Sequence, residues 1–186
     1  MGELEKLLQG VGLRFFRAPD RPALLVGARG LNGSYRVLVA LEVDGQFLQF
    51  RTLDYLHCQA DHKYATEVLK VIGDINFTRR ILKLGWDPSD GEIVGYADAC
   101  LMDSKLTQGQ FKRMVEIYLP ALDLSYGRIK TTMETGKDPG DLDPQEVARR
   151  LAGSGSLPKA VEDLLSRLRG KGERVPEQPP PKVPTL

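Results

Sequence analysis

The sequence feature that most constrains the fold is a pair of alternating apolar segments joined by a short turn. The segments are YRVLVALEV at 35–43 and QFLQFRTL at 46–53, and Asp44-Gly45 separates them. Asp-Gly between such segments is typical of a two-residue type I′ turn, because both turn residues need a positive φ. The sequence therefore predicts an antiparallel β-hairpin here.

A two-residue turn also fixes which residues of this hairpin face each other. One face carries apolar pairs and is expected to be buried, while the other suits partial exposure to solvent. A slip of one residue would exchange the two faces, so the apolar pattern specifies the register. The pairs expected on the buried face are Leu41–Leu48, Val39–Phe50 and Val37–Thr52, and those on the other face are Glu42–Phe47, Ala40–Gln49 and Leu38–Arg51.

Helical and extended patterns flank the hairpin. Residues 3–9 carry leucines at helical spacing, and residues 60–76 carry an apolar stripe wide enough to be covered on more than one side. Thr107 and Gln110 form a capping box that begins a third helix, which should kink or split at Pro120 because proline removes a helical hydrogen bond. Further strands are expected at 13–18, 23–28, 81–86 and 92–102, the last two joined by a turn at 87–91.

The elements follow the order α-β-β-β-α-β-β-α, which predicts an α+β domain with an antiparallel sheet and helices packed on it. We assign this core domain to residues 1–136. Renewed helix signals predict a C-terminal helical appendage over 137–170. Proline is dense in residues 171–186, which predicts a disordered tail that acts as a spacer or tether.

Composition and charge exclude several classes of protein. The chain has 26 Lys and Arg against 25 Asp and Glu, a net charge of +1, so a basic nucleic-acid-binding surface is not expected. No apolar segment has the length of a membrane span or the character of a signal peptide. The two cysteines, Cys58 and Cys100, are too few for a disulfide scaffold. We therefore expect a cytoplasmic protein with free thiols and no membrane or nucleic-acid partner.

Three segments carry a resemblance to a known family: VALEVDGQFLQF at 39–50, INFTRRILKLGWDPSDGEIVGYADACL at 75–101 and LTQGQFKRMVEIYLPAL at 106–122. Together with the order of elements, they make residues 3–130 resemble the YbjN family. The resemblance implies the fold of the Tir-chaperone-like, or type III secretion chaperone, superfamily. Secretion chaperones of that superfamily are small acidic dimers that bind extended segments of other proteins, whereas this chain is nearly neutral. The family offers no catalytic residues to carry over.

His57, Cys58, Asp61 and His62 form the densest group of metal-ligating residue types, and they include the only two histidines. A structural zinc site usually needs two separated ligand pairs, and a helix beginning near residue 60 would scatter these four. We interpret the group as a polar connecting loop and expect neither a metal nor another cofactor. The alternative is a small metal-binding protein or enzyme centred on this group.

Three other motifs favour structural interpretations. Gly27, Gly30 and Gly33 lack the Gly-Lys-Ser/Thr ending and the following helix of a phosphate-binding loop, so they indicate a loop between strands. Residues 87–91 lack the downstream glutamate of a calcium loop and indicate a hairpin turn. The basic cluster at 79–83 is interpreted as a solvated strand edge.

We predict a non-enzymatic, chaperone-like module that binds another polypeptide, its partner unidentified. The strand at 13–18 carries Leu13, Phe15 and Phe16 near an expected sheet edge. Such an edge could accept an extended partner segment by strand addition.

A second predicted surface lies on the 60–76 helix. Val68, Leu69 and Ile72 belong to its wide apolar stripe and could form the contact of a homodimer. Val68 and Leu69 point about 100° apart around the helix. We therefore expect one of the two to face the sheet and the other to face outward.

Overall fold

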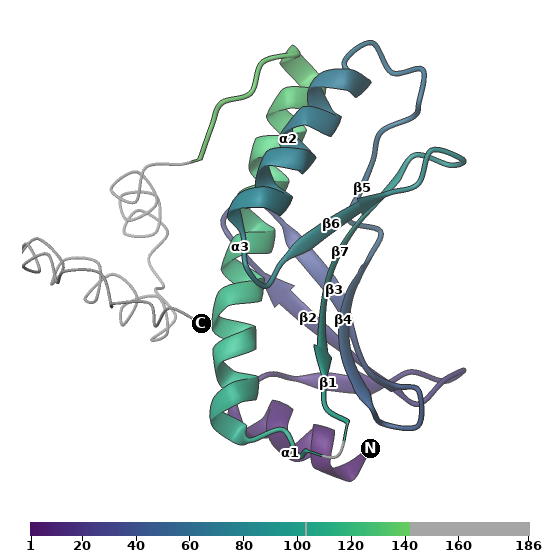
Figure 1. The fold of residues 1–186 in the computed structure, drawn as a ribbon, viewed down its shortest axis with the longest axis vertical. Helices are drawn as coiled ribbons and strands as arrows, with labels where there is room; N and C mark the ends of the chain where they lie inside the picture. Colours follow the sequence, from purple (N-terminus) through teal and green to yellow (C-terminus); the bar gives the residue numbers. More distant parts are fainter. Residues whose placement is uncertain (103, 142–186) are drawn as a thin grey trace, which may run out of the picture. The chain divides into compact units, whose positions relative to one another are not determined.

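The computed structural model describes residues 1–102 and 104–141, and the account below is confined to them. Three helices and a seven-stranded antiparallel sheet form this part of the chain (Figure 1). The predicted α+β class and the predicted order of elements are confirmed. The elements are α1 (Gly2–Gly10), β1 (Phe15–Arg17), β2 (Ala23–Arg29), β3 (Ser34–Glu42), β4 (Phe47–Leu53), β5 (Leu56–His57), α2 (Ala65–Thr78), β6 (Lys83–Trp86), β7 (Glu92–Cys100) and α3 (Gln108–Thr135).

The strands follow the order β1-β2-β3-β4-β7-β5, and β6 also pairs with β7. β4 and β5 meet successive parts of the same side of β7, with Asp54 at φ 50° between them. β6 pairs with β7 on the other side, at Ile93–Tyr96. The two edges of the sheet are therefore β1 and β6, and the three helices lie on one side of it (Figure 1).

The register predicted for the hairpin of β3 and β4 is confirmed at all six pairs. Asp44 and Gly45 have φ values of 54° and 88°, as a type I′ turn requires. Val43 also has a positive φ, 50°, so the ladder ends at Glu42–Phe47 and does not include the pair Val43–Gln46 that the two-residue turn predicts. The predicted apolar face is buried except for Leu41, which is half-buried.

The opposite face of the hairpin departs from the prediction of partial exposure. Leu38 and Ala40 are buried, and with Ala23 they form a second small apolar cluster. The reason is β2, which places Ala23 opposite Ala40 and Leu25 opposite Leu38. Cross-strand neighbours thus shield side chains that the hairpin alone would leave exposed.

The core lies between the sheet and the three helices, and α3 supplies its largest side chains. Phe111, Tyr118, Leu122 and Ile129 of α3 are fully buried, and Phe111 and Tyr118 pack against Phe50 of β4. The capping box of Thr107 and Gln110 is confirmed, and α3 runs unbroken through Pro120, so the helix does not split there.

Gly95 allows α3 to approach the sheet closely. A Cβ atom at this position would lie 2.5 Å from a methyl carbon of Leu122, which is too close for a side chain. The Gly95 N–H donates to Thr52 Oγ1 at 2.8 Å, and the Tyr118 hydroxyl donates to the Gly95 carbonyl at 2.8 Å. These side chains replace ladder hydrogen bonds where β7 passes from β4 to β5.

The start of the second helix differs from the prediction. α2 begins at Ala65 rather than at 60, because hydrogen bonds from His62 N–H to Gln59 O and from Ala65 N–H to His62 O close turns there.

The core-domain boundary at 136 stays a prediction. The predicted appendage over 137–170 lies outside the described residues from 142 on, as does the whole tail at 171–186. No helix within the described ranges combines the length and hydropathy that crossing a membrane requires.

Candidate functional site

The edge formed by β1 carries the first predicted binding surface. Among the described residues, β1 pairs only with β2, and the Ala18 N–H donates to the Ala23 carbonyl at 2.9 Å. The alternation of an antiparallel ladder then directs the N–H and C=O groups of Phe15 and Arg17 away from β2. These groups form an edge to which another strand could pair.

Of the three side chains predicted for this surface, one is exposed and two are partly buried. Leu13 and Phe15 are partly buried and pack against the main core. Phe16 is 74% exposed and lies opposite Leu25 on the sheet face that the helices leave uncovered. An ion pair of 2.7 Å joins Arg17 to Glu5 of α1, and this hydrogen bond lowers the pKa of the Glu5 carboxyl.

The opposite edge, β6, is closed by α2. The Asn76 side chain accepts from the Leu84 N–H at 2.7 Å and donates to the Leu84 carbonyl at 2.9 Å, so it replaces a neighbouring strand. The Lys83 ammonium donates to the carbonyls of Asn76 and Arg79 at 2.7 and 2.8 Å. Lys83 therefore caps the C-terminus of α2, which corrects its interpretation as a solvated strand-edge charge.

The three residues of the second predicted surface, all on α2, differ in their exposure to solvent. Val68 is 1% exposed and Ile72 is also buried, whereas Leu69 is 37% exposed. Phe77, which the prediction did not include, is 91% exposed one turn beyond Gly73. Leu69, Gly73 and Phe77 follow at intervals of four and form one row along the helix, which we call the α2 ridge.

The group of metal-ligating residue types around His57 is not assembled into a site. His57 and Asp61 are exposed, while Cys58 is buried, and burial raises the pKa of its thiol. The His62 ring accepts a hydrogen bond at Nδ1 from the Tyr64 N–H at 3.2 Å. Within the described part of the chain, no group of three or more His, Cys, Asp or Glu side chains could hold a metal ion. The geometry thus gives no support to a metal centre or enzyme at this group.

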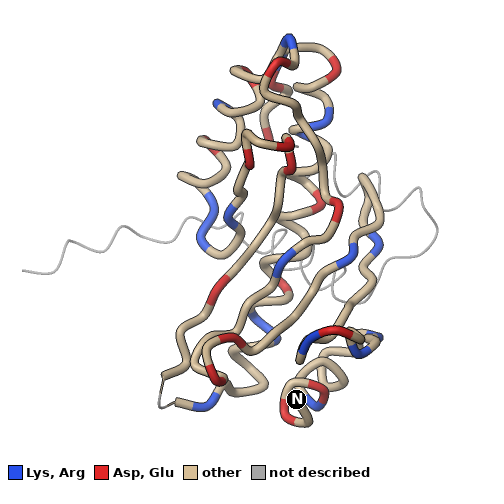
Figure 2. Tube along the Cα trace, turned by 90° about the vertical axis from the view of Figure 1, so that its right-hand side faces the viewer, with Lys and Arg blue, Asp and Glu red and all other residues tan. Residues whose placement is uncertain are grey.

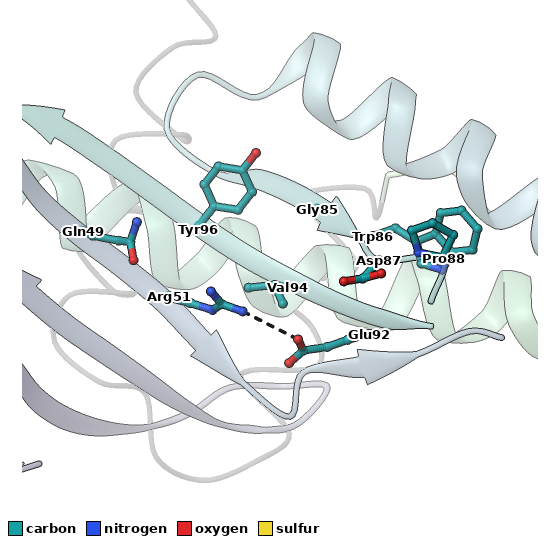
Figure 3. A pocket seen from close by; sticks show the side chains of 9 residues that line it. All are labelled: Gln49, Arg51, Gly85, Trp86, Asp87, Pro88, Glu92, Val94 and Tyr96. Atoms are coloured by element: carbon teal, nitrogen blue, oxygen red, sulfur yellow. Dashed lines mark ion pairs between the residues drawn. The ribbon is translucent and has the colours of Figure 1, made fainter. Parts of the chain in front are cut away.

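A shallow groove of about 420 Å³ lies on the sheet face away from the helices (Figure 3). Arg51 and Glu92 pair across it at 3.6 Å. The Trp86 indole N–H is already engaged, because it donates to the Cys58 carbonyl at 2.8 Å. The two carboxylates of the lining are engaged, because Glu92 pairs with Arg51 and Asp87 accepts hydrogen bonds from the N–H and the hydroxyl of Ser89. The lining residues are Gln49, Arg51, Gly85, Trp86, Asp87, Pro88, Glu92, Val94 and Tyr96.

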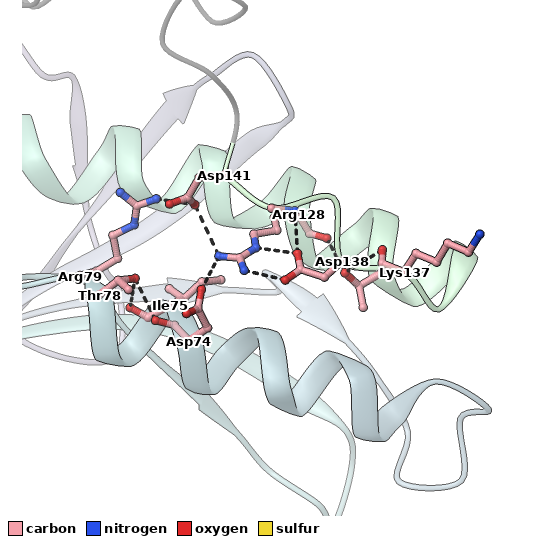
Figure 4. Close-up of polar contacts among 10 residues, drawn as sticks. Asp74, Ile75, Thr78, Arg79, Arg128, Lys137, Asp138 and Asp141 are labelled. Atoms are coloured by element: carbon pink, nitrogen blue, oxygen red, sulfur yellow. Dashed lines mark hydrogen bonds and ion pairs between the residues drawn. The ribbon is translucent and has the colours of Figure 1, made fainter.

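A buried arginine ties the segment after α3 to α2 (Figure 4). Arg128 is buried and pairs with Asp74 of α2 at 2.8 Å and with Asp138 at 2.6 Å. Arg79, predicted to be a solvated basic residue, is half-buried and pairs with Asp141 at 2.7 Å. The hydrogen bond to Asp138 raises the pKa of Arg128, and the same contact lowers the pKa of Asp138. The members are far apart in sequence, so periodicity could not group them.

This network predicts a pH-dependent contribution to stability. The pKa of Asp138 is lower in the folded chain than in the unfolded chain, so its contribution is present above the unfolded value of about 3.9 and is lost as the pH falls through the folded value. Arg128→Met should therefore lower the free energy of unfolding at pH 7, by a margin that shrinks as the pH falls below about 4. Urea denaturation at pH 7, 5 and 3 measures this margin. Lys130→Met, which removes an exposed charge from the same helix, should change little at any pH, and a margin for Arg128→Met that is independent of pH would contradict the assignment.

Basic and acidic residues alternate over the strand side of the molecule. Figure 2 shows Lys and Arg interspersed with Asp and Glu there, and no continuous basic area in this view. Several of these charges are paired, for example Arg36 with Asp54 and Arg51 with Glu92. The electrostatic footprint of a nucleic-acid-binding face is a clustered basic surface, which this side does not present.

Comparison with known proteins identifies the class of this fold. The sequence profile of YbjN, described as "Putative bacterial sensory transduction regulator", matches residues 2–130. The chain therefore belongs to the YbjN family, as the resemblance in its sequence indicated. No curated protein sequence matches it.

The chain is similar to two solved structures. One is the "Crystal structure of YbjN, a putative transcription regulator from E. coli", with a TM-score of 0.54 and 16% sequence identity, over 70% of this chain and 90% of that one. The other is the "Structure of the HopA1-SchA Chaperone-Effector Complex", with a TM-score of 0.42 and 14% identity, over 64% of this chain and 86% of that one. At these identities, the first of them supports the fold alone.

Proposed function

We propose that this chain is a non-enzymatic, chaperone-like module that acts as a homodimer and binds an extended segment of another protein. The observation that carries the proposal is the exposure of large apolar side chains at two separate places, Phe16 beside the β1 edge and Phe77 on the α2 ridge. Exposed apolar side chains of this size mark interaction sites when they adjoin an open edge or a helix row. The description of the family supports a bacterial adaptor or regulator, and a cytoplasmic location is part of the proposal.

The β1 edge is suited to an extended partner. Strand addition uses main-chain hydrogen bonds for affinity and pockets for alternate side chains for specificity. Phe15 and Arg17 supply the main-chain groups, and Phe16 with Leu25 supplies an apolar surface on the uncovered sheet face. Because Asn76 closes the other edge at β6, a partner strand has its main-chain groups available at β1.

The α2 ridge is suited to a second copy of the chain. Gly73 has open space where a Cβ would be, so another helix could approach closely between Leu69 and Phe77. A stable interface needs on the order of 1,000 Å² of total buried area, more than one helix row supplies. Residues adjoining α2 must therefore contribute, and the contact is isologous, each ridge meeting its counterpart.

The dimer predicts opposite results for two neighbouring substitutions. Leu69→Asp places a charge on the ridge and should yield a folded monomer, because Leu69 is 37% exposed. Val68→Asp places the charge in the core, where Val68 is 1% exposed, and should unfold the domain. Light scattering at micromolar concentration should report about twice 20.7 kDa for the wild-type chain and about 20.7 kDa for Leu69→Asp. A monomeric wild type would refute the homodimer.

Partner binding is tested at the β1 edge with a matched pair of variants. Arg17→Pro removes an edge N–H that points away from β2, whereas Arg17→Ala removes the same side chain and keeps the N–H. Affinity capture from source-cell lysate with the wild-type chain, followed by mass spectrometry, identifies bound proteins. A genuine strand-addition partner should be retained by Arg17→Ala and lost by Arg17→Pro. Equal retention by both variants would exclude strand addition at this edge.

A further inference from the structure

A second groove, of about 340 Å³, lies between the C-terminal end of β7 and the first turns of α3. Neither the β1 edge nor the α2 ridge includes it. Its floor is apolar and comes from three separate segments: Ile81 before β6, Ala99 and Leu101 at the end of β7, and Leu106, Met114 and Ile117 around the start of α3. All six side chains are only partly buried, so a bound molecule would remove apolar area from water. We call it the β7–α3 groove.

An unpaired stretch of β7 borders this groove. β6 accompanies β7 only as far as Tyr96, whereas β7 continues to Cys100. The Leu101 N–H donates to the Gln46 carbonyl on the β4 side at 2.7 Å. By the alternation of an antiparallel ladder, the N–H and C=O groups of Asp98 and Cys100 point the other way. No described residue forms a backbone hydrogen bond with these four groups.

The same alternation accounts for the closed part of this edge. Tyr96 pairs with Lys83 through groups that point away from β4, and Leu84 on the outer side of β6 is satisfied by Asn76. The protection that α2 gives to the edge therefore ends with β6, and β7 is open beyond Tyr96. An added segment could continue the line of β6 there, with alternate side chains directed onto the apolar floor.

The rim of the groove is basic. Lys105 and Arg113 are its charged lining residues, and both are exposed. Neither forms an ion pair with another described residue, and the described lining contains no Asp or Glu. The charge of the rim therefore complements an acidic segment, while the floor complements an apolar one.

We propose that the β7–α3 groove binds an extended segment of a partner protein in which apolar residues alternate with Asp or Glu. The apolar residues pack on the floor around Met114, the carboxylates pair with Lys105 and Arg113, and the backbone pairs with Asp98 and Cys100. This inference rests on the proposed function and deepens it, because it names the chemistry of the partner segment.

The test uses the full chain and a pair of labelled heptapeptides. One alternates Glu and Leu, and the other replaces every Glu with Lys, so the two have equal apolar content. Fluorescence anisotropy should detect binding of the acidic peptide and little binding of the basic one. Lys105→Glu combined with Arg113→Glu should weaken the acidic peptide roughly tenfold or more, whereas Lys130→Glu, on the exposed far part of α3, should leave it unchanged. Equal binding of both peptides, or equal loss with Lys130→Glu, would overturn the proposal.

Cys100 supplies an independent reporter of occupancy. It lines the groove and is exposed, whereas Cys58, the other cysteine, is buried. Bound acidic peptide should slow alkylation of Cys100 by N-ethylmaleimide several-fold, and Cys100→Ser, which keeps only the buried Cys58, measures the background alkylation. A captured partner that depends on the β1 edge but leaves Cys100 fully reactive would refute the groove and leave the proposed function standing. Dissociation of the dimer by Met114→Glu would identify the groove as a contact between copies, which also overturns the proposal.

Discussion

Replacing Asp123 with alanine should lower the free energy of unfolding by about 3–5 kcal/mol. Asp123 lies on α3 and is buried, and its carboxylate accepts four hydrogen bonds from the loop between β2 and β3 and from the start of β3. The three short ones come from the Leu31 N–H at 2.8 Å, the Asn32 N–H at 2.9 Å and the Tyr35 hydroxyl at 2.6 Å, and the Asn32 side-chain amide donates the fourth at 3.4 Å. Alanine would leave the donors of the three short bonds partly buried without an acceptor, which costs more than the bonds themselves contribute.

The loop that Asp123 anchors lies close to α3, and glycines at positions 30 and 127 leave room for this contact. A Cβ atom on Gly30 would lie 2.2 Å from a carboxylate oxygen of Asp123, and one on Gly127 would lie 2.7 Å from the Asn32 side-chain oxygen. The Asn32 amide also donates to the Asp123 backbone carbonyl at 3.0 Å. Burial and the hydrogen bond to Asp123 together raise the pKa of Tyr35, so the hydroxyl stays protonated and remains a donor.

Urea denaturation at pH 7 checks the prediction through the midpoint and the slope of the transition. Asp20→Ala removes an exposed carboxylate elsewhere in the chain and should be nearly silent. Asp123→Asn keeps an acceptor for some of the donors and should fall between the two. A midpoint for Asp123→Ala equal to that of Asp20→Ala would show that Asp123 does not anchor the loop.

Asp123 also shows where sequence reasoning stops. The hairpin register was predictable because it depends on a turn and an alternation confined to about twenty neighbouring residues. The acceptor for the loop at 30–33 stands some ninety positions away, so nothing in the local pattern of the loop indicates it. Asn76 and Arg128 were missed for the same reason, since each acts only after α2 or α3 has docked.

The candidate surfaces were predictable in part. Helical period indicated that Val68 and Leu69 differ in exposure, but only the docked sheet decides that Val68 is the buried one. Phe77 had a detectable signal, because it continues the spacing of Leu69 and Gly73 when the helix is extended to Thr78. The β7–α3 groove had none, since its floor joins Ile81 to residues near the start of α3 that are not contiguous with it in sequence.

The largest expected loss of stability comes from placing aspartate at Val39 in β3, and the same substitution at Val43 in the turn is its control. Val39 is 1% exposed and lies opposite Phe50 in the centre of the sheet. Val39→Asp would bury a carboxylate that has no partner, at a cost of at least about 4 kcal/mol. Since a domain of this size is stable by only about 5–15 kcal/mol, this variant should be largely unfolded or should unfold at much lower urea concentration.

Val43→Asp, four residues further on, should cause no loss of stability. Val43 is 62% exposed and holds a φ of 50°, where a β-branched side chain is strained. Aspartate tolerates this left-handed region better than valine and is exposed to water there. We therefore expect Val43→Asp to leave the urea midpoint unchanged or to raise it slightly, while Val39→Asp lowers it sharply. Similar losses in both variants would contradict this prediction. They would mean that apolar contacts of Val43 hold the turn in its conformation, and that the pairing of β3 with β4 extends beyond Glu42.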